Sequence, residues 1–297
     1  MTLTEGPRID SHLHLWDIDA GEYAWLTPEH GPLHATFTAE QAKLELDAAG
    51  IDSAVLVQAE DSLRDTESML AIATAHPWVA GVVGWVPLDD PEATERALEQ
   101  WAQHPAFCGI RHLIHDDPRP DFLLQPAIRD SLALVAGAGV AFDVPDAWPT
   151  ILGQAVEVAE AIPALTVVID HLAKPPLGFV ASGPEGFTAW RKTFARAARL
   201  PNVVAKVSGL TVPAVPFTAD ALRPAWDAAL ESFGPSRLMY GGDWPITVRA
   251  GGYQAAWSVY AELIGELSSL EQSELLHSTA MKAYRLQPSE RKLEEGA

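Results

Sequence analysis

The chain alternates short apolar runs, rich in β-branched residues, with longer segments of helical pattern, and it does so eight times in succession. The candidate strands are Arg8–Leu15, Ser53–Gln58, Val79–Val86, Phe107–His115, Val140–Val144, Leu165–Leu172, Val203–Leu210 and Arg237–Asp243. Helical patterns lie at Thr38–Ala49, Arg64–Ala75, Pro91–Gln103, Pro126–Ala138, Thr150–Ala161, Gly186–Leu200, Asp220–Phe233, Tyr253–Glu266 and Glu271–Tyr284. Continuous apolar runs such as "LTVVI" suit strands that are covered on both faces, as parallel strands are. Eight strand-then-helix units therefore predict an α/β fold of the (β/α)8 TIM barrel type.

The main alternative for such a chain is a doubly wound open sheet. That fold commonly carries a Gly-x-Gly-x-x-Gly turn after its first strand, whereas this chain has the glycine-poor stretch "HLHLWDIDAGEYAW" there. The length of 297 residues suits one barrel of about 250 residues with extensions, and no linker or internal repeat divides the chain. We therefore expect a single barrel domain over residues 1–297, of which 287–297 form a polar, flexible tail.

Composition narrows the classes of partner. The chain has 20 Lys and Arg against 40 Asp and Glu, a formal net charge of −20, and so acidic a surface should repel nucleic acid and anionic membranes. No stretch approaches about 18 consecutive apolar residues, and "MTLTEGPRID" lacks the basic and apolar segments of a secretory signal. The single cysteine, Cys108, cannot form an internal disulfide. We expect a cytoplasmic protein that acts on a small molecule, and the sequence leaves a homo-oligomer open.

Polar side chains gather at the carboxyl ends of the candidate strands, where the chemistry of a (β/α)8 barrel collects. They include Gln58, Glu60, Arg111, His112, His115, Asp143, Asp170, His171, Lys174, Lys206, Ser208 and Asp243. Because side chains alternate along a strand, His12 and His14 share a face and their imidazoles converge. Two converging imidazoles suit a divalent metal or a pair of donors to a substrate oxygen. A His-x-His pair alone is a weak signal, but its combination with His171 and Asp243 at other strand ends favours a functional site.

Six motifs resemble the successive strand motifs of the amidohydrolase superfamily. They are "IDSHLHLWD", "VLVQAE", "GIRHLIHDDP", "VVIDHLAKP", "VVAKVSGL" and "LMYGGDWP". More narrowly, they are similar to its lactonase branch, which contains L-fuconolactonase-like and L-rhamnono-lactonase-like enzymes and the 2-pyrone-4,6-dicarboxylate lactonases. The resemblance runs from residue 9 to about 285, and its most specific parts are "DHLAKP" and "GGDWP". It implies a distorted (β/α)8 barrel of the amidohydrolase type with a hydrolytic site.

The resemblance also implies which residues form the site. His12 and His14 match the pair on the first strand. His171 matches the histidine of the "DH" motif, and Asp243 matches the aspartate of the last strand. Arg111 matches the arginine of "G-[IV]-R-H", which faces substrate. The first four are therefore the candidate catalytic residues.

Further side chains at the strand ends are candidates for substrate binding. With Arg111, they are Trp16, His115, Trp148 and Trp244. Arg111 could bind a carboxylate or sugar hydroxyls, or it could form an ion pair with Asp143. The indole faces could stack on a sugar ring, although most tryptophans pack in cores and loops.

Lactone hydrolysis needs an activated water, a polarised carbonyl and a stabilised oxyanion. Asp243 is the candidate base, because aspartate side chains are ionised at neutral pH. It can accept a proton from water and later return it to the leaving alkoxide. The three imidazoles can polarise the carbonyl, either directly or through a metal.

The sequence leaves open whether the site binds a metal. His12, His14, His171 and Asp243 could hold one Zn²⁺ or Mn²⁺, whereas a two-metal centre is not expected because the fifth and seventh strands offer no obvious histidine. The resemblance implies that members of the lactonase branch can also work without metal. Because an ester carbonyl is more electrophilic than an amide, we expect catalysis that does not require a metal.

Three functions are compatible with these residues. The leading hypothesis is a hydrolase of small lactones, above all sugar-acid lactones, in carbohydrate catabolism. The second is a metal-dependent decarboxylase of an aromatic or muconate-type acid; such relatives usually add a histidine on the strand after the middle one, where "VVAKVSGL" has none. The third is a catalytically silent barrel that binds a ligand or a partner.

Overall fold

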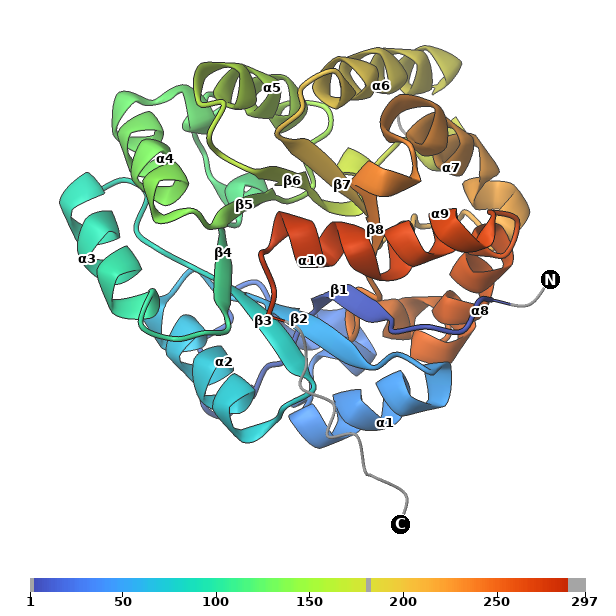
Figure 1. Ribbon diagram of the computed structural model, residues 1–297, viewed down its shortest axis with the longest axis horizontal. Coiled ribbons are helices and arrows are strands. Elements are labelled where there is room, and N and C mark those ends of the chain that lie inside the picture. The colour runs from blue at the N-terminus through green and yellow to red at the C-terminus, as the bar shows by residue number, and fades with distance from the viewer. Residues whose placement is uncertain (1–2, 180–182, 288–297) are drawn as a thin grey trace.

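The computed structural model describes residues 3–179 and 183–287 (Figure 1). Its strands are β1 (Ile9–Leu13), β2 (Ser53–Val57), β3 (Val79–Gly84), β4 (Phe107–Arg111), β5 (Ala141–Val144), β6 (Val167–Ile169), β7 (Val203–Val207) and β8 (Leu238–Tyr240). They form one eight-stranded parallel sheet in chain order. The predicted (β/α)8 barrel is confirmed. The predicted tail, 287–297, lies outside the described residues except for Gln287.

The main helices lie around this sheet, as Figure 1 shows. They are α1 (Ala39–Ala49), α2 (Leu63–Ala75), α3 (Pro91–Trp101), α4 (Pro126–Ala138), α5 (Ile151–Ala161), α6 (Gly183–Ala198), α7 (Ala219–Phe233) and α8 (Tyr253–Ile264). In α1, Thr38 accepts a hydrogen bond from the Gln41 N–H, and Gly50 ends the helix at a left-handed φ of 67°. Within the described ranges, no helix combines the length and the apolar character that crossing a bilayer requires.

The barrel closes between β8 and β1 through residues just beyond the strands. Leu13 and Trp244 form an isolated parallel bridge, and the His14 N–H donates to the Trp244 carbonyl over 2.8 Å. The Asp243 N–H donates to the His12 carbonyl over 2.7 Å. The backbone of the candidate site therefore makes the seam of the barrel.

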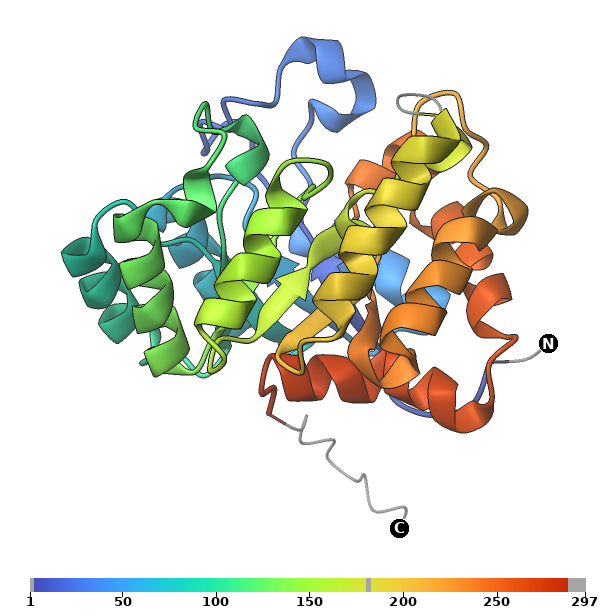
Figure 2. The same cartoon turned by 90° about the horizontal axis from the view of Figure 1, so that it is seen from above.

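The C-terminal segment from Ser269 to Ala283 covers the amino ends of the strands. α9 (Ser269–Ser273), a π-helical turn (Glu274–Ser278) and α10 (Thr279–Ala283) cross there, on the side of the barrel opposite to the loop before α1 (Figure 2). The single helix predicted over Glu271–Tyr284 thus contains a π-turn. Tyr284 packs into a buried cluster with inward side chains of the strands, so this segment forms the floor of the barrel.

Each of the eight strands is shorter than the sequence predicts, and the differences at β6 and β8 concern the site. β6 ends at Ile169 because His171 takes a left-handed φ of 54°. β8 ends at Tyr240, and Asp243 takes a φ of 51°. A left-handed backbone cannot continue a strand, and non-glycine residues in that conformation concentrate at functional sites. The two side chains therefore project from tight turns after the strands.

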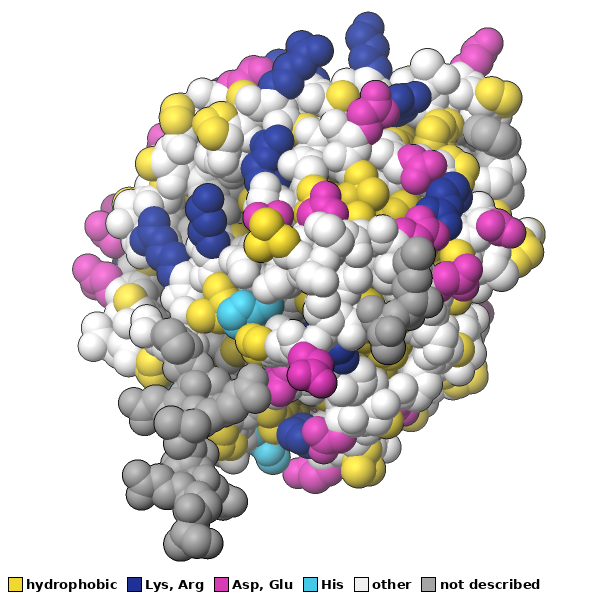
Figure 3. Space-filling view, turned by 45° about the vertical axis from the view of Figure 1, so that its right-hand side comes forward, with side chains coloured by type: hydrophobic (Ala, Val, Ile, Leu, Met, Phe, Trp, Pro, Cys, Tyr) yellow, Lys and Arg dark blue, Asp and Glu magenta, His cyan; other side chains and the backbone are white. Residues whose placement is uncertain are grey.

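The surface is acidic without a block of one sign. Figure 3 shows acidic and basic side chains interspersed over one face of the molecule. Several of the pairs are close, such as Arg223 with Glu266 and Arg196 with Glu160. Exposed pairs of this kind contribute little to stability individually. The net charge of −20 is thus distributed over a mixed surface on the face shown.

A buried carboxyl in the β2–α2 loop makes stability depend on pH. Asp65 accepts N–H groups of Ala59 and Glu60 at 2.9 and 3.3 Å, and burial raises its pKa from 3.8 to about 6. The folded chain thus holds this proton more tightly than the unfolded chain, so the stability that Asp65 contributes falls as the pH rises from 4 to 7. At about 1.4 kcal/mol per pH unit, the loss is about 3 kcal/mol. We expect Asp65→Asn to remove this loss, measured as the unfolding free energy in urea at each pH. Parallel stability curves for the two proteins would contradict the account.

Candidate active site

The two imidazoles of the first strand converge, as their spacing predicts. The Nε2 atoms of His12 and His14 lie 3.1 Å apart, and both rings are buried. His14 Nδ1 lies 2.8 Å from the Val57 carbonyl oxygen, which can only accept. His14 therefore carries its proton on Nδ1, and its Nε2 lone pair is directed at the site.

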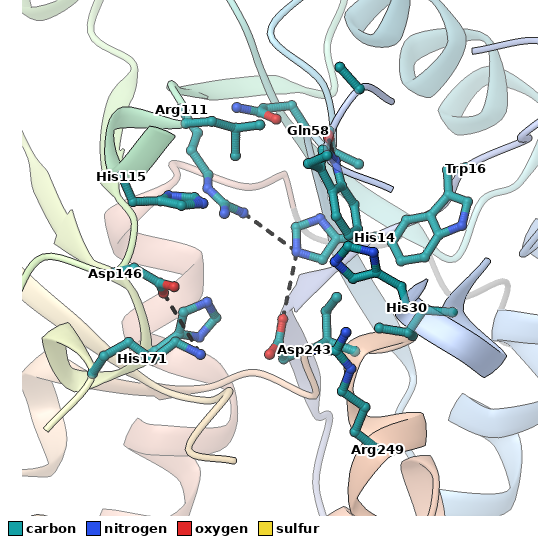
Figure 4. Close-up of a pocket in the computed structure, with 17 residues that line it drawn as sticks. His14, Trp16, His30, Gln58, Arg111, His115, Asp146, His171, Asp243 and Arg249 are labelled. Atoms are coloured by element: carbon teal, nitrogen blue, oxygen red, sulfur yellow. Dashed lines mark hydrogen bonds and ion pairs between the residues drawn. The ribbon is translucent and has the colours of Figure 1, made fainter. Parts of the chain in front are cut away.

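Asp243 and His171 complete a cluster from three distant segments. Asp243 Oδ1 lies 3.6 Å from His14 Nε2 and 3.8 Å from His12 Nε2. The rings of His171 and His12 are 4.6 Å apart between centroids, and His171 Nδ1 lies 2.9 Å from the Ser208 hydroxyl. In Figure 4, His14, His171 and Asp243 face the same space. The four residues singled out from the sequence thus meet in one place.

Burial keeps two of these imidazoles neutral. It lowers the pKa of His12 well below the ordinary value, and the nearby charge of Lys206 lowers it further. The pKa of His171 is also well below its ordinary value, mainly through burial and then through Lys174. Neutral imidazoles can donate from one nitrogen and accept at the other, so hydrogen bonds decide their roles.

Arg111 reaches the same cluster from β4. Its Nη1 lies 3.4 Å from His12 Nε2 and 3.5 Å from His14 Nε2, as the dashed line to His14 in Figure 4 indicates. The alternative ion pair with Asp143 is wrong. Arg111 Nε instead lies 3.6 Å from Asp170 Oδ2, because Asp143 is bound by Lys206 at 2.5 Å.

The cluster opens into a cavity of about 670 Å³ at the carboxyl ends of the strands. Its lining includes His14, Trp16, Trp25, His30, Gln58, Arg111, Leu113, His115, Asp146, His171, Lys174, Asp243, Ile246 and Arg249. Figure 4 shows many of these side chains around a common space. A cavity of this size suits a small molecule with several polar groups.

Two of the predicted sugar-stacking tryptophans lie elsewhere. Trp16 and His115 line the cavity, but Trp148 and Trp244 are not among the described residues that do so. Trp244 is buried and packs edge-on against Phe37 at 5.2 Å between centroids. Trp148 is half-buried against the barrel core. The structure gives this pair no place in the cavity lining, because a position near a strand end does not tell which way an indole turns.

The sequence profile of the amidohydrolase family matches residues 9–286. The chain belongs to the amidohydrolase family. The L-fucono-1,5-lactonase of Burkholderia ambifaria is 33% identical over 259 residues, which cover 86% of this chain and 87% of that protein. The L-fucono-1,5-lactonase of Burkholderia multivorans is 31% identical, with 96% of this chain and 99% of that protein covered. A crystal structure of a Burkholderia multivorans amidohydrolase with bound zinc has a TM-score of 0.84 and 29% identity, covering 95% of this chain and 100% of that one.

The donor atoms of this amidohydrolase fit a single divalent ion, with a different grouping from the predicted one. His12, His14 and Asp243 place one ligand atom each within 4.8 Å of one another. His171 belongs to a second group, with His12 and Asp170, so the four predicted ligands do not form one set. Asp170 Oδ1 lies 3.3 Å from His12 Nδ1, where a carboxylate supports a metal-binding histidine. Nitrogen and oxygen donors in this number suit Zn²⁺ or Mn²⁺.

Sequence reasoning undervalued several residues of the site. Asp170 and Lys206 were visible only as polar residues near strand ends, yet both are fully buried beside His12. Burial would raise the pKa of Asp170, but Lys206 and Arg111 outweigh it and the pKa lies below its ordinary value. A lysine within the apolar run "VVAKV" was the signal for a buried ion pair. Trp25 lies in a loop whose sequence has no periodicity, so the sequence did not indicate that it lines the cavity.

A glycine on the β7 loop gives a direct test of this packing. Gly209 has a φ of +54°, and a methyl group there would overlap His171 Nδ1 and lie 2.6 Å from Asp243 Oδ2. We expect Gly209→Ala to lower kcat/KM by about 100-fold, since displacements near 1 Å cost that much. The matched control is Gly50→Ala, also at positive φ (+67°), where the nearest atom is a flexible Arg8 nitrogen at 3.2 Å. It should lose about 1–2 kcal/mol of stability and no activity. Equal activity losses in the two variants would contradict the assignment.

Proposed function

We propose that this amidohydrolase opens small lactones, above all sugar-acid lactones, by hydrolysis in carbohydrate catabolism. The observation that carries the proposal is a carboxylate, Asp243, 3.6 Å from His14 and exposed to a cavity that Arg111 also lines. The similarity to two L-fucono-1,5-lactonases supports a sugar-acid lactone as substrate. A cytoplasmic location and assembly into a homo-oligomer remain predictions from the sequence.

The residues suggest a two-step reaction. Asp243 takes a proton from water as the water oxygen adds to the lactone carbonyl carbon, and Arg111 stabilises the negative charge that develops on the carbonyl oxygen. The acyl C–O bond of the ring then breaks. Asp243 returns its proton to the leaving oxygen, and the product is the open hydroxy acid. His171 is positioned beside the cavity to donate to the carbonyl oxygen or to the leaving group.

The chain's own charges reduce the need for a metal. His12, His14 and Asp243 would hold one divalent ion, Zn²⁺ or Mn²⁺, which when bound supplies Lewis-acid polarisation of the carbonyl. The zinc in the related crystal structure supports that capacity. Arg111, however, already places a permanent cation 3.5 Å from the His14 Nε2 atom. We therefore propose that the metal is optional for an ester substrate.

The decarboxylase hypothesis gains no support from the site. It calls for a further histidine on the strand after the middle one, and β7 carries Lys206 at its inner face instead. Solved decarboxylases of the superfamily share the fold, at 14–16% identity and TM-scores of 0.62–0.64. A silent binding barrel would not need a buried carboxylate beside neutral imidazoles. Lactone hydrolysis uses the carboxylate as the base and the imidazole of His171 as a donor.

The base assignment predicts the effect of removing one charge. We expect purified protein to acidify solutions of 1,5- and 1,4-aldonolactones, and Asp243→Asn to lower kcat by about 100-fold or more with little change in KM. The matched control is Asp146→Asn, which removes a second cavity carboxylate that pairs with Lys174 at 3.7 Å. It should lower kcat less than tenfold. A pH-indicator assay measures both. No turnover across the lactone panel would refute the proposal.

Metal dependence is tested separately. We expect protein stripped with a picolinate chelator, with its metal content checked by mass spectrometry, to keep its kcat within about twofold, because Arg111 remains as a fixed cation. Adding Zn²⁺ or Mn²⁺ back should alter the rate only modestly. Loss of activity on stripping, restored by either ion, would show that the metal is required.

A further inference from the structure

Beneath the proposed active site lies a lysine that the reaction as described does not use. Lys206, on β7, is fully buried inside the barrel. Its Nζ lies 2.5 Å from Asp143 Oδ2, 3.0 Å from Asp170 Oδ1 and 3.0 Å from His12 Nδ1. Two carboxylates at these distances keep the side chain as an ammonium. An ammonium has three N–H donors and no acceptor, so the third N–H is available for His12.

We propose that Lys206 is a positioning residue: it donates to His12 Nδ1, keeps the His12 proton on Nε2, and thereby sets the hydrogen bonds of the active site. The neutral ring has one proton, and a nitrogen that accepts from Lys206 cannot also carry it. His12 Nε2 must then be the N–H. This assignment concerns the reaction of the proposed function, but the tautomer itself can be measured without it.

The other end of the same series of hydrogen bonds is compatible with this assignment. His14 donates from Nδ1 to Val57, so His14 Nε2 has a free lone pair 3.1 Å from His12 Nε2. With the proton on His12 Nε2, each donor from Lys206 through His12 and His14 to the Val57 carbonyl meets an acceptor, and Arg111 Nη1, 3.4 Å from His12 Nε2 and 3.5 Å from His14 Nε2, has the His14 lone pair to donate to. With the proton on His12 Nδ1, Arg111 would donate to both Nε2 lone pairs, but the His12 N–H would meet the Lys206 N–H at 3.0 Å.

The direction of these hydrogen bonds has two consequences for the site. His12 Nε2 lies 3.8 Å from Asp243 Oδ1, beyond hydrogen-bond distance, so its N–H presents only a partial positive charge to the carboxylate that acts as base. A metal ion at His12 needs the Nε2 lone pair, and it would have to move the proton to Nδ1 against Lys206. The lysine thus favours the arrangement without metal and weakens binding of a divalent ion by the same three donors.

The floor of the barrel holds the lysine in place. The Tyr284 hydroxyl donates to Asp143 Oδ2 over 2.7 Å, and Lys206 Nζ lies 5.4 Å from the centre of the Tyr284 ring. The C-terminal segment therefore contacts, through Tyr284, the carboxylate that binds the lysine. A buried ammonium with this many partners has one arrangement, which is what orienting His12 requires.

The experiment combines histidine NMR with zinc titration. Long-range ¹H–¹⁵N spectra of ¹⁵N-histidine-labelled protein, assigned with His12→Gln, should show His12 protonated on Nε2. In the charge-balanced variant Lys206→Met/Asp143→Asn, the proton should move to Nδ1. Zinc affinity should rise about tenfold or more, and kcat should fall about 10- to 100-fold with KM changed less, the range found for groups that orient a site. Cys108→Ala, which alters the same buried cluster, should leave all three measurements unchanged.

The outcomes separate the two proposals. If wild-type protein hydrolyses no lactone, the proposed function fails, while the spectra and the zinc titration still test Lys206. A wild-type spectrum with the His12 proton on Nδ1 overturns the assignment, even if the double variant does not fold. Unchanged zinc affinity in a folded double variant, verified by circular dichroism, overturns it as well.

Discussion

The seam between the first and last strands governs both the fold and the site. A (β/α)8 barrel is closed only when β8 pairs with β1, and here that pairing uses the backbone of His12, His14 and Asp243. The buried carboxylate of Asp10 reinforces it by accepting the N–H groups of His12 and Gly242 at 2.9 and 2.8 Å. A distortion that opened the seam would separate the base from the imidazoles. Barrel closure therefore holds the reacting groups in register without a loop having to order first.

The barrel interior holds buried charges of both signs. The chain carries a net charge of −20, yet Lys206 and Arg111 are buried near its centre and Lys174 lies at the cavity. Each cation has carboxylate partners, which offset the cost of burial. Reactions that develop negative charge on a carbonyl oxygen are favoured by fixed positive charge in such a water-poor site. The buried cations thus offset the carboxylates around them and place fixed positive charge beside the cavity.

The sequence predicted those features that depend on residues close together in the chain. Eight apolar runs predicted the strands, and the spacing of His12 and His14 predicted that their rings converge, which the 3.1 Å contact confirms. Local pattern does not determine which side chains meet across a barrel, so the alternative ion pair of Arg111 with Asp143 was wrong. It also does not reveal left-handed turns, so His171 and Asp243 were placed on strands. Side-chain direction beyond a strand end depends on loop packing, which explains why Trp148 and Trp244 are not in the cavity lining.

The position of one proton separates two chemistries that the same donors allow. His12 can ligate a metal at this site only through a deprotonated Nε2, and it can donate to His14 Nε2 only through a protonated one. The groups next to His12 Nδ1 decide between these states. Asp170 alone would favour the proton on Nδ1. The ammonium of Lys206, at 3.0 Å, favours the proton on Nε2. A barrel with this outer scaffold can therefore change from metal-assisted to metal-independent hydrolysis without changing any residue that touches the substrate. Such a change needs only a buried cation on the neighbouring strand and a carboxylate to keep it charged.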